Sequence, residues 1–251
     1  MSISTEGTYK VITPGNTFVA DVSVFDGTSY GISYGDPHSP EGACVYMSYE
    51  AGERLMKLDS IVWAPRCAAS GRLERGAGTR DMLASVLRVC FDSFPSLERI
   101  CFNDVAAIPC QGRDVTLSYM SLCRHGQTWY ERHFGARPAK RKTRDRLAAF
   151  RALLGGRPCP GVFSFFSSSS AAATWHEFFA QQDCAFFLRH QEEIQRRSGV
   201  HLMYSPWYIP RRAAAAVDVR VVRVRLPRRG GSSSSTGPRA SREQRLHLED
   251  T

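Results

Sequence analysis

Residues 73–102, LERGAGTRDMLASVLRVCFDSFPSLERICF, decide the fold. The first part of this stretch holds two glycines, Gly76 and Gly78, which favour a loop. The apolar residues that follow recur at the spacing of one helix face: Met82, Leu83, Val86, Leu87 and Cys90. Pro95 is expected to end this helix, and the apolar run 97–102 is typical of a strand. The stretch therefore predicts a glycine loop, a helix and a strand in succession.

The chain before this stretch, from Thr17 to Ala64, predicts a series of strands. Four runs combine β-branched, aromatic and alternating residues: 18–25, 29–34, 44–49 and 55–63. Asp26-Gly27 and Ala51-Gly52 supply turns between them. Short connections favour antiparallel neighbours. We therefore predict an α+β (mixed α/β) fold, with a central, mostly antiparallel twisted sheet flanked by helices.

The chain after this stretch is expected to complete and cover the sheet. Thr174 and Glu177 have the spacing of a capping box, which predicts a helix over 175–197 that stops at Gly199. The segment 200–209 predicts a closing strand. Residues 1–210 are thus expected to form one domain, with a core over 17–136 and its completion over 137–210.

The positive charge is concentrated in two segments. The net formal charge is +9, yet residues 137–157 alone hold eight basic and one acidic side chain, and residues 211–251 hold ten and four. In the first segment Leu147, Phe150 and Leu154 lie at helical spacing, which predicts an amphipathic helix with a solvated basic face. A minority hypothesis gives that face a weak contact with nucleic acid.

The last segment predicts a disordered basic tail. Residues 211–251 are rich in proline, glycine, serine and arginine and cannot bury much apolar surface. The one candidate strand within it consists of the valines Val217, Val219, Val221 and Val224. This tail either stays solvated or makes weak electrostatic contact with nucleic acid.

The eight cysteines are scattered without a C-x-x-C pair. This spacing argues against a disulfide framework and a zinc site, so we expect buried, reduced cysteines and no metal. Residues 1–16 lack the basic and apolar regions of a secretory signal. Serines interrupt the uncharged stretch 158–176, so it is not expected to span a membrane. These features predict an intracellular protein, in the cytoplasm or nucleus, with no membrane partner.

The order of these parts resembles the GNAT superfamily of acetyl-CoA-dependent N-acetyltransferases. The resemblance covers roughly residues 17–136 and rests on the strands, the loop 75–79, the following helix, the strand ending at Asn103, and the segment 129–136 (WYERHFGA). The chain also looks like a divergent branch found in large DNA viruses, where a Thr-Trp-Tyr-Glu segment closes the domain. Residues 128–131 match that segment, and a viral origin would place the protein in a host cell.

The resemblance implies a site for acetyl-CoA. In the family, the glycine loop after the fourth strand binds the pyrophosphate of coenzyme A. Here this role falls to the backbone of Arg75, Gly76, Ala77, Gly78 and Thr79. Asn103 lies at a strand end where the family often has an asparagine. Tyr130 matches the family tyrosine whose hydroxyl can protonate the departing thiolate.

The chain departs from the family pattern at three places. Leu73 stands where an arginine or glutamine usually opens the glycine loop. Residues 104–127 form an insertion between Asn103 and the segment of Tyr130. The family's Gly-Phe pair is Phe134-Gly135 here.

Transfer to an amine also needs a base, and Asp59 on the strand 55–63 is the candidate. The alternative for Asp59 is a solvent-facing carboxylate paired with a neighbour such as Lys57. The alternative for Tyr130 is core packing between Trp129 and Phe134.

These observations predict an N-acetyltransferase that moves an acetyl group from acetyl-CoA to an unidentified amine on a small molecule or a protein. Two hypotheses of other classes stay open. The chain is a GNAT-like binding or structural module without catalysis, or it is a globular carrier whose basic segments bind nucleic acid with an affinity that falls steeply with salt. Saturable binding of coenzyme A separates the first from the others.

Overall fold

A computed structural model describes residues 5–35, 44–62, 64, 67–71, 73–74, 77–167, 170–214 and 218–224. The strands of its main sheet are β1 (Gly7–Ile12), β2 (Asn16–Phe25), β3 (Ser29–Tyr34), β4 (Val45–Glu50), β5 (Leu55–Ile61), β6 (Ser70–Gly71), β7 (Arg99–Asn103), β10 (Arg137–Pro138), β11 (Pro206–Pro210) and β12 (Arg220–Arg223). A separate hairpin consists of β8 (Ala107–Cys110) and β9 (Arg113–Thr116).

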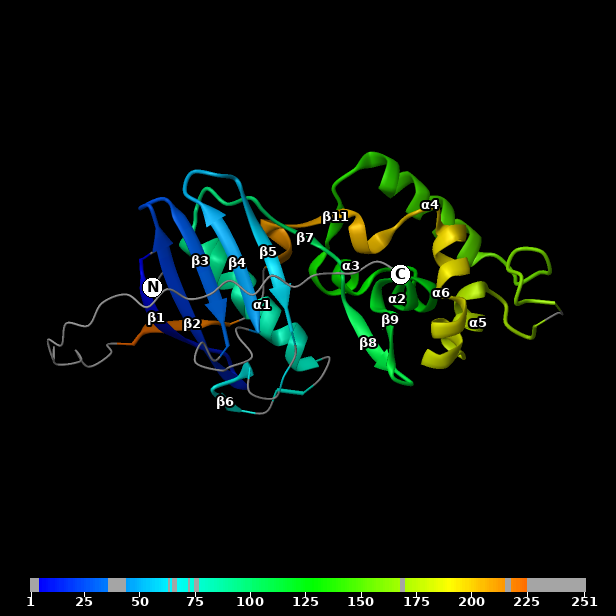
Figure 1. The fold of residues 1–251 in the computed structure, drawn as a ribbon, viewed down its shortest axis with the longest axis horizontal. Coiled ribbons are helices and arrows are strands. Elements are labelled where there is room, and N and C mark those ends of the chain that lie inside the picture. The colour runs from blue at the N-terminus through cyan, green and yellow to red at the C-terminus, as the bar shows by residue number, and fades with distance from the viewer. Residues whose placement is uncertain are drawn as a thin grey trace, which may run out of the picture.

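The helices are α1 (Ala77–Ser93), α2 (Leu117–His125), α3 (Trp129–Phe134), α4 (Arg141–Gly155), α5 (Trp175–Ala180) and α6 (Cys184–Ser198), with 3-10 turns η2 (Leu202–Tyr204) and η3 (Arg211–Ala214). Within the described residues the sheet order is β10-β11-β7-β5-β4-β3-β2-β1-β12, and β6 pairs with β2. The fold is therefore a mixed α+β fold with a large, mostly antiparallel sheet flanked by helices, as predicted. Figure 1 shows the sheet and α1 in one half of the molecule and α2, α4, α5 and α6 in the other.

The antiparallel meander β1 to β5 follows from alternation and tight turns. Phe18, Ala20 and Val22 of β2 point to one face and are fully or almost fully buried. At the β2–β3 turn, which spans residues 26–28, both Asp26 and Gly27 adopt positive φ, 49° and 71°, and the Thr28 N–H donates to the Phe25 carbonyl. The sequence predicted these strands closely, but not β1, which pairs with β2 along its whole length.

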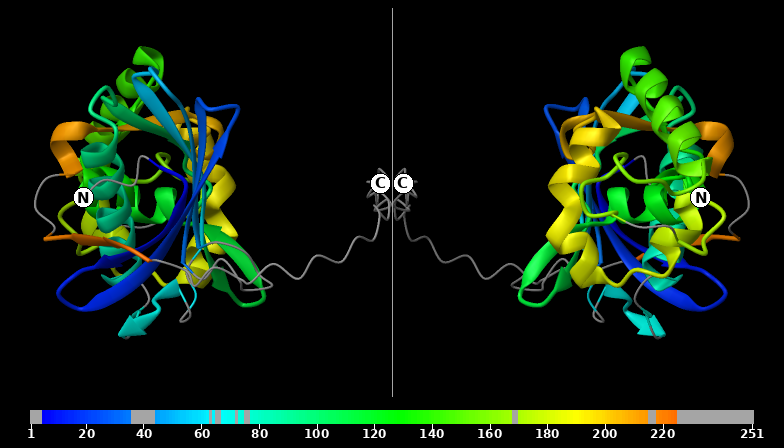
Figure 2. Two further views of the ribbon diagram at one scale, coloured as in Figure 1. Left: turned by 90° about the vertical axis from the view of Figure 1, so that its left-hand side faces the viewer. Right: turned by 90° about the vertical axis from the view of Figure 1, so that its right-hand side faces the viewer.

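Helix α1 packs on the buried face of the sheet. All five apolar residues that predicted its inner face have 0% exposure. Inside this contact the hydroxyl groups of Tyr34 and Ser85 lie 2.6 Å apart, which pairs two polar groups that would otherwise be buried alone. The end-on views in Figure 2 show the twist of the sheet with α1 on one side of it.

The strands β5 and β7 form a parallel pair, and they are joined through α1. Their ladder runs from Leu55 opposite Arg99 to Lys57 opposite Cys101 and ends there, although both strands continue. On the other side of β5, Tyr46 and Met47 face Ser60 and Leu58, so Asp59 is an extra residue in a β-bulge. The carboxyl end of β5 is therefore not hydrogen-bonded to β7.

The helix predicted over 175–197 is two helices. Thr174 caps α5 by accepting the Glu177 N–H, as its spacing predicted. Asp183 accepts the Phe186 N–H and starts α6 as a second N-cap, and Gly199 ends α6 with φ 64°. The predicted strand 200–209 is shorter as well, because η2 precedes β11.

The prediction that all cysteines stay reduced is wrong. Cys44 is bonded to Cys67, and Cys110 is bonded to Cys184. The partners are distant in sequence, and the fold brings their Cα atoms to 5.7 and 6.0 Å, within the range of a disulfide. Cys90, Cys101, Cys123 and Cys159 are free.

Two parts of the predicted tail have regular structure, so disorder does not hold for them. In η3, the Arg211 guanidinium donates to the carbonyl oxygens of Phe94, Pro95 and Leu97. Strand β12 pairs with β1 and contains Val221, one of the four valines of the candidate strand. Residues 215–217 and 225–251 lie outside the described residues. No helix in the described part of the chain is long and apolar enough to cross a membrane.

Candidate functional site

A cavity of about 600 Å³ lies where β5 and β7 separate. It is lined by residues 58–62, 102–103 and 105–108, with Thr79, Leu117, Trp129 and Tyr130. The carboxyl ends of parallel strands and the first turn of the connecting helix are where open α/β sheets bind ligands. The cavity has this placement, because Ile61 and Asn103 end β5 and β7, and Thr79 belongs to the first turn of α1.

The cavity brings together four residues that the sequence singled out. Asp59 comes from β5, Thr79 from α1, Asn103 from the end of β7 and Tyr130 from α3. They come from four elements, so only the tertiary fold places them together. Of the remaining predicted residues, Ala77 and Gly78 lie in the first turn of α1, whereas Arg75 and Gly76 lie outside the described residues.

Gly78 has a packing role. The predicted loop extended to Thr79, but α1 already begins at Ala77, and the Gly78 N–H donates to the Glu74 carbonyl at 2.8 Å. A Cβ atom at position 78 would lie 3.0 Å from the side chain of Leu73, which is buried. Glycine therefore lets the helix start approach Leu73 closely, and its N–H is already used inside the chain.

Asp59 lies in the bulge of β5 and is exposed. Its carboxylate accepts a hydrogen bond of 2.7 Å from the Ser48 hydroxyl on the neighbouring strand β4. Lys57, the partner proposed from sequence, forms no ion pair with it among the described residues. Asp59 thus lines the cavity as a solvated, hydrogen-bonded carboxylate, and its role as base stays a prediction.

Tyr130 is almost fully buried, with 4% exposure, yet it lines the cavity. Its ring packs 4.5 Å from the ring of Phe102 and 5.0 Å from that of Trp129, measured between centroids. Burial, followed by the nearby charge of Asp104, raises the pKa of its phenol far above the usual value. The hydroxyl therefore keeps its proton at neutral pH, and its role as an acid stays a prediction. Packing and an acid role are compatible here.

Asp104 is a residue that sequence reasoning missed. It directly follows β7, is 2% exposed, and accepts a hydrogen bond of 3.3 Å from the Ala106 N–H. Desolvation by burial raises its pKa to about 7, and the charge of Glu131 adds to the effect. Asn103, Val105 and Ala106 around it line the cavity. An acidic residue just past a strand of a parallel pair was the available signal.

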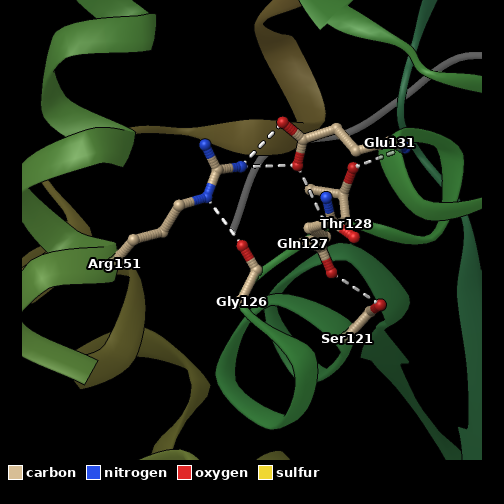
Figure 3. Close-up of polar contacts among 6 residues, drawn as sticks. All are labelled: Ser121, Gly126, Gln127, Thr128, Glu131 and Arg151. Carbon is tan, nitrogen blue, oxygen red and sulfur yellow. Dashed lines mark hydrogen bonds and ion pairs between the residues drawn. The ribbon is translucent and has the colours of Figure 1, made fainter. Parts of the chain in front are cut away.

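Helix α3, which carries Trp129 and Tyr130, is fixed at its start by a polar network (Figure 3). Thr128 and Glu131 form a capping box, with the Thr128 N–H donating to the carboxylate at 2.9 Å. The Arg151 guanidinium of α4 donates to both carboxylate oxygens at 2.6 and 2.7 Å, and to the Gly126 carbonyl at 2.6 Å. Because Glu131 is mostly buried, this charge-assisted contact holds α3 firmly against α4.

The basic helix α4 has the predicted amphipathic form. Leu147, Phe150 and Leu154 are buried, and the basic residues face outward. Arg144 and Arg146 donate to backbone carbonyls of Pro138 and Gly199. Part of the basic face is therefore used in hydrogen bonds within the chain. Contact of this face with nucleic acid stays a prediction. Among the described residues, no group of three or more His, Cys, Asp or Glu side chains is placed to hold a metal ion.

Comparison with protein-family models, with curated proteins and with solved structures finds no match for this chain.

Proposed function

We propose that the chain transfers an acetyl group from acetyl-CoA to an amine. The observation that carries this proposal is the cavity between β5 and β7, in which Asp59, Thr79, Asn103 and Tyr130 meet. The resemblance to GNAT N-acetyltransferases assigns Thr79 and Asn103 to the donor and Tyr130 to catalysis, and Asp59 is the candidate base. A mostly antiparallel sheet with a helix after its antiparallel strands is also what that resemblance implies.

The cavity wall suits the long arm of coenzyme A. Beyond Lys57 the edge of β5 that faced β7 has no strand partner among the described residues, so its backbone N–H and C=O groups need other hydrogen-bond partners. The pantetheine arm is a narrow extended chain with two amide groups, and such a chain pairs with a strand edge as an added strand does. The bulge at Asp59 keeps β5 away from β7 and leaves room for it.

The start of α1 provides a place for the phosphate groups. The N-terminus of a helix of this length carries partial positive charge and unpaired N–H groups. The Thr79 side chain is half-buried and lines the cavity at this point. The Gly78 N–H takes no part in our proposal, because it is bonded to Glu74.

The chemistry needs one proton acceptor and one proton donor. Asp59, whose exposed carboxylate lines the cavity, takes a proton from the ammonium of the acceptor. The free amine attacks the acetyl carbon and the carbon–sulfur bond breaks. The departing sulfur takes the proton of the Tyr130 phenol as the new amide nitrogen gives its extra proton back to Tyr130, and Asp59 releases its proton to solvent. The products are the amide, free coenzyme A and one proton.

A binding module without catalysis is the second candidate. The observation that favours it is the packing of Leu73 against Gly78, because a buried leucine replaces the polar residue expected at the loop. This module would bind coenzyme A without turning acetyl-CoA over, so thiol release in the presence of amines separates the two.

Isothermal titration of acetyl-CoA into the full chain tests the proposal. We expect saturable binding with Kd in roughly the micromolar range. Ser60→Trp places a large ring at an exposed position of the cavity wall and should abolish binding, whereas Ser23→Trp, at an exposed position of β2, should not. Absence of binding by the folded wild-type chain would reject the proposal, and so would equal binding by both variants.

A further inference from the structure

The insertion 104–127 supplies one whole wall of the cavity. It folds into β8, β9 and α2, and its cavity-lining residues are Val105, Ala106, Ala107, Ile108 and Leu117. None of these side chains carries a hydrogen-bonding group. The wall is also held in place, because the disulfide from Cys110 joins the end of β8 to Cys184 at the start of α6.

The rest of the cavity is mixed in character. It also contains apolar side chains, such as Leu58, Ile61 and Phe102, but all of the polar groups that line the cavity are on this side. They include Asp59 and Ser60 of β5, Thr79 of α1 and Asn103 of β7. The proposed donor site uses this side, which includes the free edge of β5 and the start of α1. The apolar wall of the insertion is therefore left to contact the acceptor.

The charges around the cavity favour a cation. Asp59 and Tyr130 are the titratable side chains that line it, and no lysine, arginine or histidine does so among the described residues. Asp104 adds a second carboxyl group behind the wall, and Glu131 is already neutralised by Arg151. An ammonium group entering the cavity meets the Asp59 carboxylate and, among the described residues, no lining cation.

We propose that the acceptor is a small primary amine attached to an apolar group, aromatic or aliphatic, and that the insertion 104–127 selects that group. This inference rests on the proposed acetyl transfer. A polyamine or a peptide would place additional charges or amide groups against the apolar wall, where nothing pairs with them, and this costs free energy. An apolar group gains free energy there by leaving water.

Val105 provides a clean way to test the wall. It is 60% exposed, so its replacement leaves the core intact. Val105→Lys removes apolar contact and adds a positive charge that repels an ammonium ion. The matched control is Val222→Lys, at a 37% exposed valine on β12, at the opposite end of the sheet from β7.

The experiment titrates 2-phenylethylamine, spermidine and 2-phenylethanol into the full chain saturated with coenzyme A. We expect 2-phenylethylamine to bind, and the other two to bind at least about tenfold more weakly. Val105→Lys should weaken 2-phenylethylamine binding by about tenfold or more and change coenzyme A binding less than about twofold. Val222→Lys should change neither.

The outcomes separate the two proposals. If coenzyme A binds but spermidine binds best, or neither amine binds, the acceptor inference is overturned while the donor site stands. Equal loss of amine binding in both lysine variants would also overturn it. If coenzyme A itself does not bind, the acetyl-transfer proposal fails first and the acceptor inference fails with it.

Discussion

At the scale of single residues, burial decides which carboxyl group has unusual chemistry. Asp104 is the one acidic side chain that is fully buried among the described residues, whereas Asp59 is exposed and hydrogen-bonded to Ser48. Loss of water disfavours the charged form of a carboxyl group. The pKa of Asp104 is therefore raised to about 7, and its carboxyl group is partly protonated at neutral pH. Asp59 lines the cavity without this desolvation, whereas Asp104 lies behind the cavity wall.

Asp104 makes the stability of the protein depend on pH. Its pKa is raised from 3.8 to about 7 in the folded chain, so between these values the folded state holds a proton that the unfolded state has lost. Stability therefore falls as pH rises through this range, by roughly 2–3 kcal/mol between pH 5 and pH 8. Asp104→Asn should remove most of this loss, as measured by urea unfolding at both pH values.

Asp59→Asn is the control for this prediction, because its exposed carboxylate should leave the pH dependence as in the wild type. Parallel pH profiles for the wild type and Asp104→Asn would contradict the assignment.

At the scale of elements, α3 depends on contacts from outside itself. A helix this short is not stable alone, so its two ends and its neighbours must hold it. Thr128 and Glu131 cap its start, Gly135 ends it in a left-handed conformation, and Arg151 of α4 locks the capping carboxylate. The position of Tyr130 in the cavity therefore depends on an arginine of the basic helix.

Glu131→Gln should destabilise the protein by about 1.5–3 kcal/mol, because the charge-assisted contact with a mostly buried carboxylate is lost and Arg151 loses its charged partner. Asp145→Asn removes an exposed pair with Arg141 at 3.8 Å and should cost less than about 0.5 kcal/mol. Urea unfolding measures both. Equal effects of the two variants would show that the Glu131–Arg151 contact stabilises the protein no more than the exposed Asp145–Arg141 pair does.

At the scale of the whole molecule, the two disulfides and the last described segment join distant parts of the chain. Cys44–Cys67 ties the start of β4 to the segment after β5, and Cys110–Cys184 ties the β8–β9 hairpin to α6. Arg211 fastens the segment after β11 to the end of α1, and β12 covers the outer edge of β1.

Loss of the Cys110–Cys184 bond should destabilise the chain by about 2–4 kcal/mol, because it closes a long loop across the insertion. The double variant Cys110→Ser/Cys184→Ser, compared with the oxidised wild type in urea unfolding, measures this loss. Peptide mapping without reductant should recover the two cysteines on linked peptides. Cys101→Ser, which changes a free cysteine, is the control. Recovery of both cysteines as free thiols would contradict the prediction.

The sequence by itself determined the local elements. Alternation of apolar residues located β2 to β5, and the helical spacing of five apolar residues located α1. Thr174 marked the start of α5, and Gly199 marked the end of α6. These signals are local, since hydrogen-bonding and side-chain periodicity repeat within a few residues. The family resemblance, and not these signals, assigned Asn103 and Tyr130 to one site, with Asp59 as the candidate base.

Only the tertiary structure decided how these elements combine. The disulfide partners, the pairing of β1 with β12, and the separation of β5 from β7 all depend on residues far apart in the chain. The raised pKa of Asp104 has the same origin, because burial is a property of packing and not of the neighbouring sequence. Local pattern thus fixed which segments form, and long-range packing fixed the cavity and the chemistry inside it.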